Sequence, residues 1–130
     1  MSTQERTVEF KTIAPQFVVP DVVTTAEYYR DKLGYEILGY FLDPPVFAMV
    51  RRGAAEIHLG KSDNGEIQTN ESVRPGLGTD AYIFVSDINE LNHDLIENGV
   101  DIIEGPVRRI YDCVEITIKD CNGFQIVFAE

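Results

Sequence analysis

Hydrophobic and polar positions follow the same order twice along the chain. An apolar, strand-like stretch at residues 17–19 leads to Asp21, and a second at residues 83–85 leads to Asp87, 66 positions later. In each copy a segment with helical spacing, a glycine and further apolar stretches follow. Self-similarity at a fixed offset indicates a duplicated structural unit.

Each copy contains one predicted helix with recognisable ends. Side chains that cap helix N-termini stand at Thr24 in the first copy and at Asp87 in the second, so we expect the helices to begin there. Gly34 and Gly99 supply the left-handed residue that ends a helix. The apolar helix faces comprise Ala26, Tyr29 and Leu33 in the first copy and Leu91, Leu95 and Ile96 in the second. Each helix is therefore expected to cover one side of a sheet.

Three apolar stretches follow each helix, so each copy is predicted to be a βαβββ unit. The stretches are residues 35–42, 46–51 and 55–60 in the first copy and 101–104, 114–119 and 124–129 in the second. The prediction is a single α+β domain, 1–130, of two tandem modules at about 12–60 and 80–130, joined by a polar linker at 61–79. We expect the curved mixed sheets to form a shared trough with the helices outside, and such a concave surface suits a small ligand.

Composition and charge narrow the classes of partner. A chain of 130 residues fits one domain, and 44% hydrophobic with 25% charged residues is typical of a globular protein. The net charge of −11 disfavours nucleic acid and anionic membrane surfaces and favours cationic partners. No apolar run could span a membrane and Met1–Lys11 does not resemble a signal peptide, which predicts a cytoplasmic protein. Two cysteines are too few for a disulfide framework.

Four stretches of the chain resemble a known superfamily. They are Val19-Pro20-Asp21, the helix segment 27–35 (EYYRDKLGY), the strand segment 55–59 (AEIHL) and residues 120–128 (DCNGFQIVF). Over about residues 12–129 the chain is similar to the vicinal oxygen chelate superfamily of glyoxalase I, extradiol dioxygenases and bleomycin-resistance proteins. The resemblance implies the two-module fold. In catalytic members it also implies a divalent metal in the trough, held by His, Gln or Glu side chains.

The metal positions implied by this resemblance are only partly filled by donor side chains. Two of them fall on Ala14 and Val127, which have no donor atom, and Gln16 replaces Ala14 only after a register shift. The other positions fall on Asp80 and on either Glu56 or His58. Catalytic metal ions normally need three protein ligands or more. We therefore expect no metal cofactor; if a divalent metal is bound, its ligands are Glu56, His58 and Asp80.

Candidate ligand-binding residues follow from strand alternation and side-chain chemistry. Counting by two from the metal positions that the resemblance implies places Gln16, Val18, Tyr82 and Phe84 on the trough side and Phe17, Val19, Ile83 and Val85 on the helix side. The predicted ligand-binding residues are Gln16, Phe47, Met49, Glu56, His58, Asp80, Tyr82, Arg109 and Tyr111. The acidic residues of this set suit a cationic ligand, and the aromatic and thioether side chains suit a flat ligand. Arg109 suits a substrate carboxylate.

Each of these candidates also has a purely structural interpretation. His58 is equally a hydrogen-bonded structural residue, Asp80 a turn carboxylate and Arg109 a solvated loop residue. Phe47, Met49 and Tyr111 are equally core or dimer contacts. Tyr28 and Tyr29 are expected to be packing residues, because their helical spacing matches that of Leu33.

Three functions remain open at this stage. The bleomycin-resistance branch implies metal-independent binding of a small, cationic or aromatic molecule without chemical change. The alternative is a metal-dependent lyase, isomerase or dioxygenase of the same superfamily, with Glu56, His58 and Asp80 in an altered site. The third is a structural or regulatory dimer with a filled trough. A homodimer is expected in each case, and the linker 61–79 is long enough to allow exchange of modules.

Overall fold

A computed structural model describes residues 7–130. Residues 1–6, which begin the segment predicted not to be a signal peptide, lie outside the described residues. The elements are β1 (Gln16–Val19), α1 (Val22–Leu33), β2 (Glu36–Phe41), β3 (Phe47–Arg52), β4 (Ala55–Lys61), α2 (Asn70–Val73), β5 (Ala81–Phe84), α3 (Ile88–Glu97), β6 (Asp101–Arg108), β7 (Val114–Lys119) and β8 (Gln125–Ala129). This order confirms the α+β fold of two tandem βαβββ modules.

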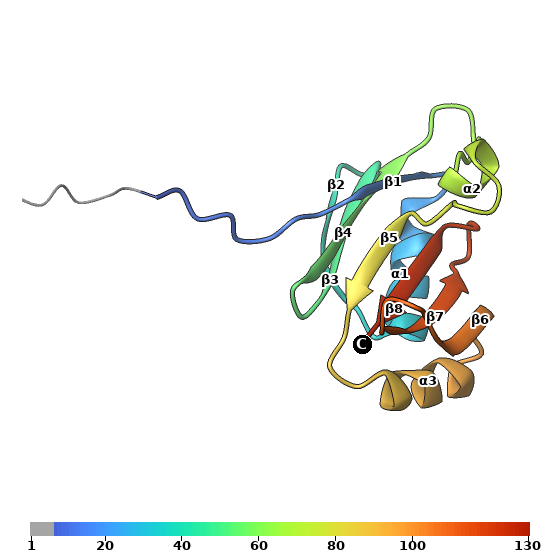
Figure 1. Cartoon of the computed structure of the whole chain (residues 1–130). Coiled ribbons are helices and arrows are strands. Elements are labelled where there is room, and N and C mark those ends of the chain that lie inside the picture. Colours follow the sequence, from blue (N-terminus) through green and yellow to red (C-terminus); the bar gives the residue numbers. More distant parts are fainter. Residues whose placement is uncertain (1–6) are drawn as a thin grey trace, which may run out of the picture.

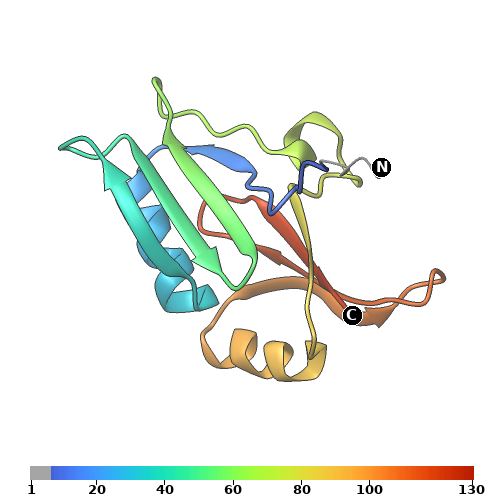
Figure 2. The ribbon, with the colours of Figure 1, turned by 90° about the vertical axis from the view of Figure 1, so that its left-hand side faces the viewer.

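The two modules form two separate four-stranded mixed sheets. The strand order is β1-β4-β3-β2 in the first sheet and β5-β8-β7-β6 in the second. In each sheet the first strand of the module runs parallel to the last, and the remaining pairs are antiparallel. Within residues 7–130 the sheets share no strand pair and do not close into a barrel. Figure 2 shows α1 behind the strands of the first sheet and α3 below the second.

The first helix begins earlier than the sequence predicts. Its N-cap is Asp21, not Thr24, and the Asp21 carboxylate accepts hydrogen bonds from the backbone N–H groups of Val23 and Thr24, both at 3.0 Å. A carboxylate on an extended residue directly before the helix satisfies these donors, so the threonines lie inside the first turn. The predicted cap at Asp87 is confirmed for α3. Gly34 has a φ of 72°, the left-handed conformation expected after α1.

Strand alternation separates a buried face from an exposed face in β1, and a half-buried face from an exposed face in β5. Phe17 and Val19 are buried, whereas Gln16 and Val18 are exposed, as predicted. In the second sheet, the side chains of β7 and β8 that face the helices join the same core. Those residues are Ile116, Ile118, Ile126 and Phe128. The two sheets thus share one continuous hydrophobic core.

Side chains of α1 and β1 connect the two modules. Tyr29 is fully buried, as its predicted packing role requires, and its hydroxyl donates to the Asp120 carboxylate at 2.6 Å. Phe17 stacks on Phe124, with ring centroids 4.4 Å apart. At the ends of the helices, Lys32 Nζ donates to the Asn98 carbonyl at 2.9 Å, and the Asn98 side-chain amide donates to the Lys32 carbonyl at 3.1 Å.

The predicted irregular linker contains a short helix. Residues of α2 begin with a capping box, in which Thr69 and Ser72 exchange hydrogen bonds. Asp80 then holds this turn against the second module, because its carboxylate accepts from the backbone N–H of Asn70. Figure 1 shows α2 above β5 and, at the opposite end of the view, α3. In the described part of the chain, no helix has the length and apolar character needed to cross a bilayer.

Candidate functional site

Five predicted site residues lie together on the exposed side of the first sheet. Glu56 and His58 alternate on β4, so their side chains share one face, and His58 Nε2 lies 2.6 Å from a Glu56 carboxylate oxygen. Gln16 of β1 and Met49 of β3 stand beside His58 in the strand register. The Phe47 ring meets the imidazole edge-on at 5.4 Å between centroids. We call this surface (Gln16, Phe47, Met49, Glu56, His58) the His58 face.

Chemically, the His58 face offers one oriented imidazole beside an apolar surface. The side chains of His58 and Glu56 are 27% and 20% exposed, so solvent reaches both partners. A carboxylate that hydrogen-bonds one ring nitrogen fixes the orientation of the imidazole. The pair can therefore hold or transfer a proton for a ligand placed against it.

Three other predicted residues converge on a carboxylate that the sequence analysis did not select. Glu115 of β7 lies on the exposed side of the second sheet, yet its side chain is only 5% exposed. The Tyr82 and Tyr111 hydroxyls donate to its Oε2 atom at 2.5 and 2.7 Å, and Arg109 Nε donates to Oε1 at 2.9 Å. Phe84 meets the Tyr82 ring edge-on at 5.2 Å. We call this surface (Tyr82, Phe84, Arg109, Tyr111, Glu115) the Glu115 face.

The hydrogen bonds to Glu115 decide its charge state. Burial alone would raise the pKa of this carboxyl, but hydrogen bonds from Tyr111, Tyr82 and Arg109 outweigh burial and lower the pKa. In return, the hydrogen bond to Glu115 raises the pKa of the Tyr82 hydroxyl, and the same contact raises that of Tyr111. At neutral pH the site therefore holds one carboxylate and two protonated tyrosines.

The Arg109 guanidinium is bonded to acidic side chains of the protein. Besides Glu115 it donates to the carboxylate of Glu104, and hydrogen bonds to these two acids raise the pKa of the guanidinium. The predicted role of Arg109, binding a substrate carboxylate, has no support from this geometry, because both of its acidic partners lie within the same hairpin. Two carboxylates and one guanidinium leave the Glu104, Arg109 and Glu115 network with one net negative charge.

Asp80 has a structural position, because its carboxylate is bonded to the backbone of two other segments. Its two carboxylate oxygens accept from the backbone N–H groups of Asn70 and Gln125, each at 2.9 Å. Among residues 7–130 there is no group of three or more His, Cys, Asp or Glu side chains placed to hold a metal ion. The alternative metal set of Glu56, His58 and Asp80 is therefore not assembled, and the donor atoms present do not fit a three-ligand metal centre.

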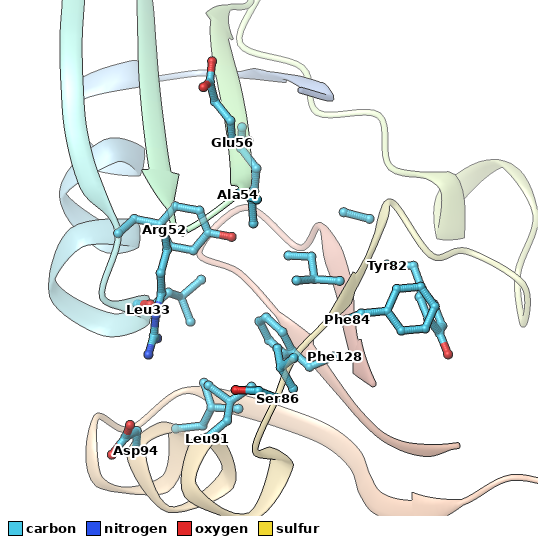
Figure 3. A pocket seen from close by; sticks show the side chains of 18 of the residues that line it. Leu33, Arg52, Ala54, Glu56, Tyr82, Phe84, Ser86, Leu91, Asp94 and Phe128 are labelled. Atoms are coloured by element: carbon cyan, nitrogen blue, oxygen red, sulfur yellow. Dashed lines mark hydrogen bonds between the residues drawn. The ribbon is translucent and has the colours of Figure 1, made fainter. Parts of the chain in front are cut away.

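A groove of about 880 Å³ lies between the first sheet and the second module. Figure 3 shows Phe128 and Leu91 on its apolar side, Arg52 and Glu56 from the first module, and Asp94 on α3. Of the predicted site residues, three line the groove: Glu56, Asp80 and Tyr82. A second cavity of about 520 Å³ includes Gln16 and Asp80. Neither cavity includes Phe47, Met49, His58, Arg109 or Tyr111.

The signal for Glu115 was present in the sequence. Within residues 114–119 (VEITIK), polar and apolar residues alternate, so a glutamate stands on the face opposite the apolar core. Its partners come from β5, which carries Tyr82, and from the loop between β6 and β7, which carries Arg109 and Tyr111. Spacing along the chain predicts the face of Glu115, but only the sheet order brings Tyr82 across β8 to reach it.

Known proteins share the fold of this chain. No protein-family model matches it. Virulence protein STM3117 of Salmonella typhimurium is 25% identical over 108 residues, which cover 81% of this chain and 73% of that protein. A glyoxalase-related enzyme from Clostridium phytofermentans superimposes with a TM-score of 0.74 at 18% identity, covering 97% of this chain and 98% of the other.

A second solved structure connects the fold to a named superfamily. It is a member of the glyoxalase, bleomycin resistance protein and dioxygenase superfamily from Sphaerobacter thermophilus. Its TM-score is 0.70 at 18% identity, with 95% of this chain and 98% of the other covered. The predicted resemblance is thus confirmed at the level of architecture: this chain has the fold of the glyoxalase, bleomycin resistance protein and dioxygenase superfamily.

Proposed function

We propose that the protein binds a small cationic or aromatic molecule without a metal cofactor and without changing it chemically. The observation that carries the proposal is the Glu115 face. There, the exposed rings of Tyr82, Phe84 and Tyr111 lie beside a network with one net negative charge. Aromatic rings and negative charge together attract organic cations.

Exposure of the aromatic rings supports binding over a purely structural role. Phe84 is 74% exposed, Tyr111 60% and Tyr82 41%. A core residue would be covered, whereas exposed aromatic clusters on a soluble fold commonly mark interaction surfaces. The net charge of −11 adds a long-range attraction for cations.

Metal independence is supported by the donor atoms that the chain offers. Ala14 and Val127 occupy two positions where the superfamily resemblance implies metal ligands, and Asp80 is engaged by backbone N–H groups. On the His58 face, Glu56 and His58 are paired with each other. That leaves no set of three free ligands for a divalent ion in the described residues.

Ligand binding and metal content are tested together on the full chain. Isothermal titration with a panel of aromatic cations, aromatic anions and neutral aromatics is expected to give saturable binding that is tightest for the cations and unchanged after EDTA treatment. Phe84→Ser removes one exposed ring and should weaken that binding several-fold. Elemental analysis that finds a stoichiometric divalent ion, with binding lost on chelation, would contradict the proposal.

We also propose that the protein is a homodimer. The support is the amount of exposed apolar surface outside the aromatic rings of the Glu115 face. Phe41 and Leu42 are about 60% exposed, and Ile110 is fully exposed. Sedimentation equilibrium at micromolar concentration should give twice the chain mass of 14.6 kDa. A monomer at that concentration would contradict this assignment.

A further inference from the structure

We infer that the Glu115 face selects cations that carry N–H groups, meaning protonated amines and amidines, over quaternary ammonium ions of the same charge. This inference rests on the proposed function, because it names the class of cation for the same surface. It goes further because it assigns a distinct role to the hydroxyl groups of Tyr82 and Tyr111: they accept hydrogen bonds from the ligand.

The first step identifies which groups around Glu115 donate a hydrogen bond and which accept one. An ionised carboxylate has no proton and can only accept hydrogen bonds. Both tyrosine hydroxyls lie within hydrogen-bond distance of the same Glu115 oxygen, at 2.5 and 2.7 Å. Each hydroxyl has a single proton, and the contact with Glu115 uses it. Toward any other molecule, the two phenolic oxygens can therefore act only as acceptors.

The second step concerns the ionisation state of the carboxyl group. This assignment of donors and acceptors requires Glu115 to stay ionised although its side chain is almost fully buried. Arg109 secures this by donating from Nε to the other carboxylate oxygen at 2.9 Å, and the pKa of Glu115 lies below its ordinary value. The carboxylate thus fixes the orientation of the two hydroxyls, and its negative charge acts at the surface through their oxygen atoms.

The third step is access and spacing. Tyr82 and Tyr111 are 41% and 60% exposed, whereas the Glu115 side chain beneath them is shielded. Because both hydroxyls bond one oxygen atom, their own oxygens lie within about 5 Å of each other. One ammonium or amidinium group can donate to both at that spacing. The Phe84 ring, edge-on to Tyr82, offers an apolar surface to the remainder of the ligand.

These features separate two kinds of organic cation. A quaternary ammonium ion interacts with aromatic rings and negative charge but has no N–H group to donate. A primary ammonium ion has the same charge and adds three donors. On this surface, two acceptor oxygens are available only to the second kind. A hydrogen bond that involves a charged group is worth about tenfold in affinity or more.

The test compares benzylammonium with benzyltrimethylammonium, which share the benzyl group and the charge; in the second, three methyl groups replace the three N–H hydrogens, and the phenylalanine variant controls for the difference in size. Each is titrated into the isotope-labelled full chain, and amide shifts are followed by NMR at residues 82, 84, 111 and 115. Benzylammonium is expected to bind about tenfold more tightly or better. In the double variant Tyr82→Phe with Tyr111→Phe, which keeps both rings, the two cations should bind equally.

A second variant reverses the direction of the hydrogen bonds between residue 115 and the two tyrosines. In Glu115→Gln the new amide donates hydrogen bonds, so the tyrosine hydroxyls turn and the preference for benzylammonium should disappear. Tyr40→Phe is the matched control, because Tyr40 is a comparably exposed tyrosine (42%) on the first sheet, away from the Glu115 face. Amide spectra of all variants check that the fold is retained.

The two proposals fail in different ways. Equal binding of both cations by the wild type, with shifts at Tyr82 and Tyr111, overturns the selection for N–H groups and leaves the proposed function standing. Absence of any saturable shift with either cation overturns the inference together with the cationic form of the proposed function. Selectivity that persists in the double phenylalanine variant also overturns the inference, because the phenolic oxygens would then not be the acceptors.

Discussion

The two modules have the same fold but carry different chemistry on corresponding faces. On the His58 face a histidine and a glutamate contact each other and remain about one quarter exposed. On the Glu115 face a carboxylate is covered by an arginine and two tyrosines. In the strand registers, His58 stands beside Gln16, whereas Val127 stands beside Tyr82. The two modules share one strand order, and their surfaces differ in side chains and in the β6–β7 loop that brings Arg109 and Tyr111 to Glu115.

From this comparison we expect burial, more than the presence of charge, to decide how much each site contributes to the free energy of unfolding. A partly exposed ion pair is worth little because water competes with both partners. A covered carboxylate leaves its partners unsatisfied when it is removed. Three measurements test this contrast, and they are given from the largest expected effect to the smallest.

The largest effect is expected from removing the Glu115 carboxylate. Glu115→Ala leaves two tyrosine hydroxyls and one side of Arg109 without a partner, and should lower the free energy of unfolding by about 2–3 kcal/mol. Glu56→Ala on the His58 face is the matched control and should cost about 0.5 kcal/mol or less. Urea unfolding measures both. Equal losses in the two variants would remove the proposed difference between the faces.

A smaller effect is expected from the second covered carboxylate of the same module, Asp120. Tyr29→Phe removes the buried hydroxyl that donates to Asp120 at 2.6 Å and should cost about 1–2 kcal/mol. Tyr28→Phe is the control, because the Tyr28 hydroxyl makes only a long contact of 3.5 Å with the Lys119 carbonyl. Thermal or urea unfolding compares the two. A larger loss for Tyr28→Phe would show that hydrogen bonding is not the source.

The smallest effect is a dependence on pH. The pKa of Glu115 is lowered in the folded protein from an ordinary value of 4.5, so its contribution is present above pH 4.5 and is lost as the pH falls through the folded value. The stability difference between wild type and Glu115→Gln should therefore narrow as the pH decreases below 4.5.

The contribution of Asp120 to the free energy of unfolding changes with pH in the opposite direction. The effect of Glu115 is therefore measured as a difference between two proteins. Burial raises the pKa of Asp120, so acidification favours the folded state at this residue. Both proteins in the comparison retain Asp120, and its contribution cancels. A difference that stays constant down to pH 3 would show that Glu115 is not held ionised by its neighbours.

The sequence predicts the architecture well because the strongest signals are local. The alternation of Gln16 and Val18 with Phe17 and Val19 is confirmed by their exposure, and the repeat at an offset of 66 is confirmed by two equivalent sheets. The start of α1 was misplaced because Asp21 and Thr24 are both competent caps, and only the backbone conformation of Asp21 distinguishes them.

The candidate site was harder to predict because its contacts are not local. Glu115 receives hydrogen bonds from Tyr82, 33 positions earlier in the chain, and from a loop whose fold is not evident from residue pattern. Asp80 was selected for its carboxylate, but backbone N–H groups occupy both of its oxygens. Residue type indicates what a side chain can donate or accept, while the partner that it finds depends on the sheet order.

The reciprocal contact between Lys32 and Asn98 has a consequence for the pairing of the two halves. Each residue supplies a donor to the last carbonyl groups of the other module's helix. Two copies of the N-terminal half, paired about the same point, would bring two ammonium groups face to face instead. The contact as observed thus needs a lysine from one module and an asparagine from the other, so the two helix ends are complementary rather than equivalent.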